Sequence, residues 1–95
     1  MKSITIEGKK WFDQKWGNTY HTSTILIDGE LKHKTPMQYG YGDQYVQTAL
    51  EWLIESGNIK MERHANGSYP PLWQYCQDNG INLHYSAQDV LKREL

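Results

Sequence analysis

An Asp-Gly pair between two strand-like segments is the feature that most constrains how this chain folds. Residues 19–27 are rich in threonine and isoleucine, which favour strands, and Asp28-Gly29 follows at once. Asp-Gly is typical of a two-residue type I′ turn, because both central residues of that turn need positive φ. Residues 30–34 alternate in polarity and supply the returning strand. The sequence therefore predicts a β-hairpin over residues 19–34.

Short strands are also expected elsewhere in the chain. Residues 3–6 alternate and are β-branched, and Gly8-Lys9-Lys10 is expected to end that strand. Residues 37–39 and residues 81–85 have the pattern of two more short strands. Residues 11–16 favour neither a strand nor a helix.

Two helices are predicted in the second half of the chain. The first covers residues 44–56, with Asp43 at its N-cap and Gly57 just past its end. Its apolar residues recur at helical spacing and form one stripe, made of Val46, Ala49, Leu50 and Leu53. Pro70-Pro71 predicts the start of a second helix over 70–79, because proline is tolerated in a first helical turn. Residues 86–89 resemble the start of a short terminal helix, capped by Ser86.

These elements together predict a fold of the α+β class. The 95 residues suffice for one domain, which we expect to span 1–95. A small antiparallel sheet centred on the 19–34 hairpin is expected to be packed on one face by the two main helices. Four Trp, seven Tyr and one Phe are expected to supply much of the apolar surface, because large rings fill small cores efficiently.

Charge and cysteine content exclude several classes of function. The net charge of −1 gives no overall basic character of the kind that nucleic-acid-binding domains carry. One cysteine cannot form an internal disulfide, which fits a reducing compartment. No signal-peptide pattern and no run of about 20 apolar residues is present, so we expect a cytoplasmic protein without a membrane partner.

The residues that could carry chemistry are scattered along the chain. The potential metal ligands His21, His33, His64, Cys76 and His84 lack the paired short spacings of zinc sites. The loop with Gly40 and Gly42 lacks the lysine of a phosphate-binding loop, and Asp43 follows it. We therefore expect no metal, no cofactor and no catalytic residues. A small enzyme is the third hypothesis, and it would need a pocket in which His21 or His33 meets Asp13 or Asp43.

Aromatic side chains suggest what the protein binds. Residues 39–45 place three tyrosines around two flexible glycines, directly before the first predicted helix. The leading hypothesis is non-catalytic binding of a protein partner, with Tyr39, Tyr41, Tyr45, Trp16 and Tyr20 as contacts. The alternative is single-stranded nucleic-acid binding in the N-terminal half through Lys9, Lys10, Trp11, Lys15 and Trp16. A homodimer, built from a strand edge or from the tyrosines, stays open.

Three segments carry a family resemblance: Gly17-Asn18-Thr19-Tyr20-His21, residues 39–49, and Pro71-Leu72-Trp73-Gln74-Tyr75-Cys76. Together with the C-terminal residues 89–95, they resemble a family of small proteins from bacterial and bacteriophage or prophage genomes. No activity is established for that family, so no site residues follow from it. The resemblance implies a small accessory protein that binds a host or phage component, and inhibition of a host system is one form of that expectation.

Overall fold

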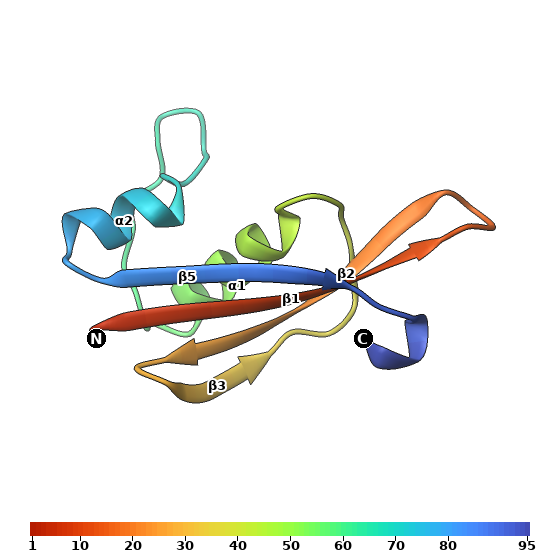
Figure 1. The fold of residues 1–95 in the computed structure, drawn as a ribbon. Coiled ribbons are helices and arrows are strands. Elements are labelled where there is room, and N and C mark those ends of the chain that lie inside the picture. The colour runs from red at the N-terminus through yellow and green to blue at the C-terminus, as the bar shows by residue number, and fades with distance from the viewer.

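A mixed five-stranded sheet with two helices on one of its faces makes up the computed structural model, which describes residues 1–95 (Figure 1). The main strands lie in the order β3-β2-β1-β5, and β4 pairs with β2. This arrangement confirms the predicted α+β fold. The elements are β1 (Ser3–Asp13), β2 (Asn18–Ile27), β3 (Glu30–Lys34), β4 (Gln38–Tyr39), α1 (Gln44–Glu55), α2 (Leu72–Asp78), β5 (Asn82–Asp89) and the 3-10 turn η1 (Lys92–Glu94).

The hairpin between β2 and β3 lies where the sequence predicts it. Asp28 and Gly29 have φ of 52° and 79°, as a type I′ turn requires. The Asp28 carboxylate also accepts hydrogen bonds from the backbone N–H groups of Lys2 and Ser3, at 2.6 and 2.9 Å. These two bonds stabilise the ionised carboxylate, so they lower the pKa of Asp28 from its usual value of 3.8.

Acid should therefore weaken the junction between the turn and β1. The folded-state pKa of Asp28 lies below the unfolded value, so its stabilising contribution is complete above about pH 4 and is lost as the pH falls through the folded pKa. We expect Asp28→Asn to lower stability at pH 7 and to flatten the loss between pH 4 and pH 2. Urea unfolding of both proteins across this range measures the difference. An equal acid loss in the variant would show that other carboxylates cause it.

Strand β1 is much longer than the sequence predicts. The expectation that Gly8-Lys9-Lys10 ends the first strand is wrong, because β1 continues unbroken to Asp13 and pairs with β2 from Ile4 to Asp13. Gly8 does not end the strand, and its role is to allow close packing against α1. A Cβ atom at Gly8 would lie 2.6 Å from Cδ2 of Tyr45, so the missing side chain makes room for the Tyr45 ring of α1.

Strand β5 differs from its prediction in direction and in length. It pairs parallel to β1, so the sheet is mixed and the expectation of an antiparallel sheet holds only for β1 to β4. Residues 86–89 belong to this strand, and the predicted helix start at Ser86 is wrong. Pairing with β1 continues through Glu7↔Ser86 to Lys10↔Asp89 and overrides the local helix-start pattern. The terminal helical turn forms later, at η1.

Both helices form close to their predicted positions. Helix α1 matches the prediction within one residue, and Gly57 follows with φ of 80°. Asp43 occupies the N-cap position, but its side chain makes no capping hydrogen bond. Helix α2 is shorter than predicted, because Pro71 is extended and the helix begins only at Leu72. Neither helix is long and apolar enough to cross a membrane.

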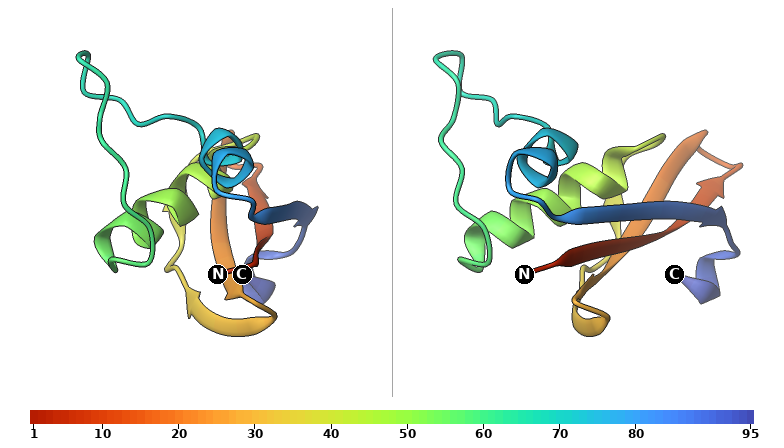
Figure 2. Two further views of the ribbon diagram at one scale, coloured as in Figure 1. Left: turned by 90° about the vertical axis from the view of Figure 1, so that its left-hand side faces the viewer. Right: turned by 60° about the vertical axis from the view of Figure 1, so that its left-hand side comes forward.

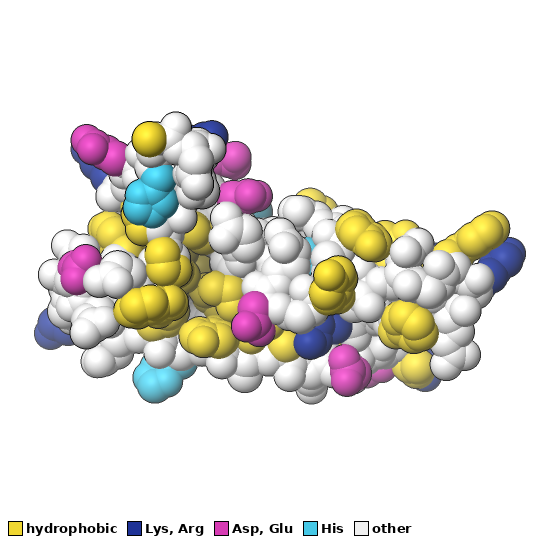
Figure 3. Space-filling view, turned by 90° about the horizontal axis from the view of Figure 1, so that it is seen from above, with side chains coloured by type: hydrophobic (Ala, Val, Ile, Leu, Met, Phe, Trp, Pro, Cys, Tyr) yellow, Lys and Arg dark blue, Asp and Glu magenta, His cyan; other side chains and the backbone are white.

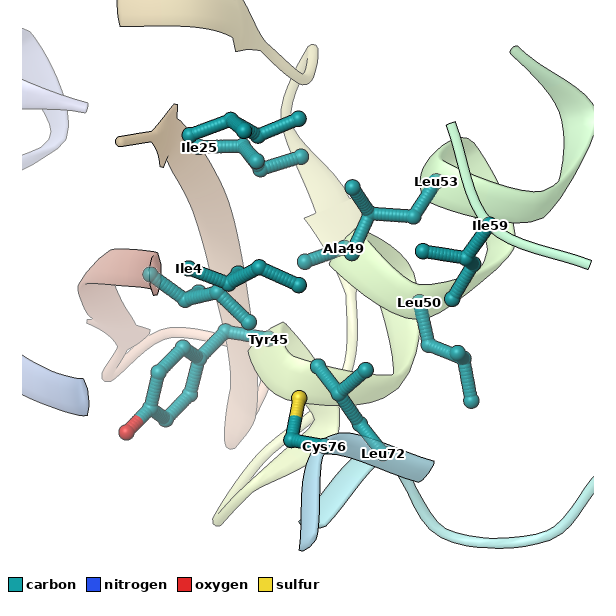
Figure 4. Packing of buried hydrophobic residues seen from close by; sticks show 11 residues of the cluster. Ile4, Ile25, Tyr45, Ala49, Leu50, Leu53, Ile59, Leu72 and Cys76 are labelled. Carbon is teal, nitrogen blue, oxygen red and sulfur yellow. The ribbon is translucent and has the colours of Figure 1, made fainter. Parts of the chain in front are cut away.

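The core lies between the sheet and the helices (Figure 4). Isoleucines of β1 and β2 oppose each other in register, Ile4 with Ile27 and Ile6 with Ile25, and face α1. Viewed along the sheet, both helices lie on the same side of the strands (Figure 2). The opposite face of the sheet is covered by neither α1 nor α2, and only the short η1 reaches it, where Lys92 meets Trp11. The core cluster consists of Ile4, Ile6, Ile25, Ile27, Tyr45, Ala49, Leu50, Leu53, Ile59, Leu72 and Cys76.

Candidate interaction surface

Three aromatic side chains form a row on the open face of the sheet. Trp11, Tyr20 and Tyr39 are paired across β1, β2 and β4, and directly paired residues share a face. His21, the next residue after Tyr20, is buried and bonded to α1. Side chains alternate along a strand, so Tyr20 and its cross-strand partners Trp11 and Tyr39 point away from α1. Ring centres lie 5.7 Å apart for Trp11 and Tyr20, and 5.9 Å apart for Tyr20 and Tyr39. We call these three residues the aromatic row.

Two lysines lie against tryptophans at this end of the molecule. Lys92 of η1 places Nζ 5.2 Å from the ring centre of Trp11. Lys15, in the turn between β1 and β2, places Nζ 5.3 Å from the ring centre of Trp16. Both distances fit cation–π contacts, which hold the rings in place through the chain's own charges. The contribution of Lys92 was missed from the sequence, because it depends on where β5 delivers the C-terminal residues.

Further aromatic rings project into solvent beside the row. Tyr41 is 74% exposed in the loop between β4 and α1, and Trp16 is 71% exposed at the hairpin tip. Tyr39 belongs to the row and is itself 61% exposed. Of the five predicted partner contacts, the structure therefore leaves Tyr39, Tyr41 and Trp16 exposed and Tyr20 half-buried within the row. We call Trp11, Trp16, Tyr20, Tyr39 and Tyr41 the aromatic surface.

Tyr45 does not belong to this surface. It is 4% exposed, it begins the buried stripe of α1, and its ring lies against Gly8. Burial raises the pKa of the Tyr45 hydroxyl above 10.0, with a smaller contribution from the charge of Asp43. Its prediction as a partner contact is wrong, because the helix begins one residue before it and turns its side chain into the core.

A buried histidine holds the loop that carries Tyr41. His21 Nδ1 lies 3.2 Å from the carbonyl oxygen of Gly40, and Nε2 lies 2.7 Å from the Thr48 hydroxyl oxygen. A carbonyl can only accept, so Nδ1 donates to Gly40, and in the tautomer with its hydrogen on Nδ1 the Nε2 atom accepts from the Thr48 hydroxyl. Gly40 also donates its N–H to the Thr19 carbonyl at 2.9 Å. The loop is therefore fixed to β2 and, through His21, to α1.

Gly40 itself is required by close packing. Its φ is 152°, and a Cβ atom there would collide with the side chain of Gln44 and lie 3.0 Å from Cε1 of His21. A side chain at position 40 would thus displace the first turn of α1 or the histidine ring. The Tyr39–Tyr41 segment keeps its shape because the residue between the two tyrosines has no side chain.

The residues of the nucleic-acid alternative do not all share a face. Alternation along β1 puts Lys9 on the open face with Trp11, whereas Lys10 pairs with His21 on the helix side. Glu7 and Asp13 alternate onto the same open face as Lys9. The face therefore has mixed charge. Lys15 and Trp16 lie outside both strands, in the turn at the hairpin tip, where they contact each other.

Three of the residues considered for chemistry, His21, His33 and Cys76, are engaged in the fold. His33 stacks on Trp52 with ring centres 4.7 Å apart, and His21 uses both ring nitrogens in the bonds described above. No three His, Cys, Asp or Glu side chains gather in an arrangement that could hold a metal ion. Cys76 is buried on α2, and burial raises the pKa of its thiol above 9.0.

Comparison with known proteins adds no relative. A scan against protein-family models, a search of curated proteins and a search of solved structures each found no match. The resemblance to a bacterial and bacteriophage family stays a prediction, and the functional argument rests on the surface geometry.

Proposed function

We propose that this protein is a non-catalytic binding protein that recognises a protein partner through its aromatic surface. One observation carries the proposal: α1 and α2 pack on one face of the sheet, while the other face has a contiguous row of aromatic rings in which Tyr39 is exposed and Trp11 and Tyr20 are half-buried. Tyrosine and tryptophan are the residues most enriched at protein interfaces and at their energetic centres. The bacteriophage resemblance favours a host protein as the partner, with inhibition as the outcome.

The backbone that carries Tyr39 and Tyr41 is held before any partner arrives. Tyr39 is paired with β2 through β4, and Gly40 is bonded to both His21 and Thr19. Ordering of side chains and loops at an interface opposes binding, by about 0.5–1.5 kcal/mol for each flexible side chain fixed. A surface that is already ordered avoids much of this cost. Tyr39, whose ring also packs on Tyr20, is therefore suited to act as a rigid anchor, and Tyr41 is presented beside it on an ordered backbone.

A protein partner suits this surface better than single-stranded nucleic acid. Stacking of bases needs free ring faces and a surplus of cations along the strand. Here Trp11 already contacts Tyr20 and Lys92, and Trp16 already contacts Lys15. Glu7 and Asp13 further reduce the positive charge of the face. Lys9, Lys15 and Lys92 could still contact phosphates, so the capture experiment below also tests the nucleic-acid alternative.

The proposal is tested by affinity capture followed by titration. The tagged protein is incubated with host lysate, with and without nuclease, and a captured protein is purified for measurement of Kd. We expect Tyr39→Ala and Tyr41→Ala each to weaken binding by about 2 kcal/mol, or roughly 30-fold in Kd, if they are anchors. Trp73→Ala is the matched control, because Trp73 is an exposed aromatic residue of α2 on the other face.

Three results would contradict the proposal. Capture that disappears with nuclease would support the nucleic-acid alternative, with affinity falling steeply as salt rises. A loss of binding in the Trp73→Ala control but not in the tyrosine variants would place the site on the helix side. Unchanged Kd in all three variants would exclude the aromatic surface.

A further inference from the structure

The two edges of the sheet differ in how they are protected. At one edge, β3 has five residues, carries Lys32 and Lys34, shifts register beside Ile25, and is followed by Pro36. Charges, irregular register and proline are the devices by which proteins prevent edge-to-edge pairing. At the other edge, β5 has eight residues in unbroken register with β1 and contains no lysine, arginine, glycine or proline. One edge is blocked, and the other is left free to pair.

The free edge presents a regular set of backbone groups. Asn82 donates its N–H to the Lys2 carbonyl and Val90 donates to the Lys10 carbonyl, at 2.9 and 2.8 Å. In a parallel ladder every second residue bonds to the neighbouring strand. The even-numbered residues of β5 therefore bond to β1, and the backbone groups of the odd-numbered residues point outward: Leu83, Tyr85, Ala87 and Asp89.

We propose that this edge pairs with the same edge of a second copy, antiparallel, about a twofold axis at Tyr85. In this register Leu83 lies opposite the partner's Ala87, and Tyr85 lies opposite the partner's Tyr85. Outward backbone groups then meet outward groups at three positions and form about six hydrogen bonds. The two sheets join into one, and the contact uses the same residues on both copies.

Side-chain matching selects this register over its neighbours. With the axis at Tyr85, every pair within 82–88 is uncharged, a large residue meets a small one at Leu83, and the amides of Asn82 and Gln88 meet. An axis at Ser86 would set the Asp89 carboxylate against Leu83 twice within the paired strands, whereas the Tyr85 axis sets it against Ile81, one residue before β5 begins. An axis at His84 would leave only residues 82–86 paired within the strand. The sequence of β5 is self-complementary in one register.

Apolar surface beside this edge adds to the argument. Tyr85 is 49% exposed and Trp73 is 55% exposed, and both line a groove of about 210 Å³ between α1, α2 and β5. Seen from above, hydrophobic side chains gather toward the α2 end of this face (Figure 3). An added strand places its odd-numbered side chains on the same side as this groove. Pairing would therefore cover apolar surface as well as backbone groups.

Cross-linking tests both the dimer and its register. We expect Tyr85→Cys to form a disulfide-linked dimer, because the two Cα atoms would lie about 5.5 Å apart, within disulfide reach. His84→Cys is the matched control, because its two copies would lie diagonally at about 7–8 Å and should not link. The native Cys76 is buried and does not compete. Efficient linking of the control, or none of Tyr85→Cys, would overturn the proposed register.

The mass in solution tests the association itself. We expect light scattering or sedimentation to give a dimer for the unmodified protein and a monomer for Ala87→Pro. Proline removes an outward N–H that β1 does not use, so the monomer fold should survive, as circular dichroism can verify. Tyr41→Ala lies on another surface and should stay dimeric, which separates this test from that of the proposed function. A monomer at all concentrations, or a dimer that persists in Ala87→Pro, would overturn the inference.

Discussion

Replacing Gly8 with alanine is expected to destabilise the fold strongly, although glycine is normally the weaker residue in a strand. The added Cβ atom would lie 2.6 Å from Cδ2 and 2.7 Å from Cγ of Tyr45. The ring cannot retreat easily, because Tyr45 is 4% exposed within the core cluster. Overpacking of this kind costs about 1–3 kcal/mol. Urea unfolding of Gly8→Ala should show that loss, against the small gain that alanine gives in an open strand.

Two variants at position 45 identify the cause. Tyr45→Phe keeps the ring, so Gly8→Ala should remain as costly in that background as in the native protein. Tyr45→Leu shortens the side chain, and Gly8→Ala should cost much less there, which appears as a coupling energy in a double-mutant cycle. An equal cost of Gly8→Ala in all backgrounds would show that the ring is not responsible.

The same contact explains why the length of β1 could not be predicted. Gly8 followed by two lysines has the local pattern of a strand end, and only the ring of Tyr45, 37 positions later in the sequence, shows why glycine is needed. The hairpin at Asp28-Gly29 and the helix over 44–55 were predictable, because their signals lie within a few residues. The prediction of β5 was wrong for the same reason as that of β1, because the end of each strand is set by pairing with a strand that is distant in the sequence.

The candidate surface also combines features that are visible locally in the sequence with features that depend on distant residues. The sequence places Tyr39 and Tyr41 on either side of Gly40 but leaves their exposure open, and the structure puts Tyr39 at the exposed end of β4 and Tyr41 in the loop that follows. Tyr45 has the same residue type and nearly the same neighbours, but it lies one residue inside α1 and turns inward. The pairing of Trp11 with Tyr20 required the register of the long β1–β2 hairpin, which depends on the full length of β1.

The second large effect is expected at His21, which is 1% exposed and bonds two elements at once. His21→Leu fills this position with an apolar side chain and leaves the Gly40 carbonyl and the Thr48 hydroxyl without their partner. A buried polar group left unpaired costs about 1–3 kcal/mol, so we expect a loss of that size for each group that water cannot reach. Urea unfolding of the variant measures the sum.

Thr48→Val separates the two bonds of His21. In the native background Thr48→Val should lower the free energy of unfolding, because Nε2 of His21 loses its hydrogen-bond partner. In the His21→Leu background the same substitution should change that free energy little, because the Thr48 hydroxyl has already lost its partner. The Gly40 bond should be measured separately, by hydrogen exchange of the Gly40 amide, whose N–H is bonded to the Thr19 carbonyl. We expect this exchange to quicken in His21→Leu and to change little in Thr48→Val. If both variants quicken exchange equally, the loop depends on α1 as a whole and not on the histidine. If the quickening in His21→Leu accompanies weaker partner binding with Tyr39 and Tyr41 intact, the order of the loop itself contributes to recognition, as expected when fixed aromatic rings bind without an ordering cost.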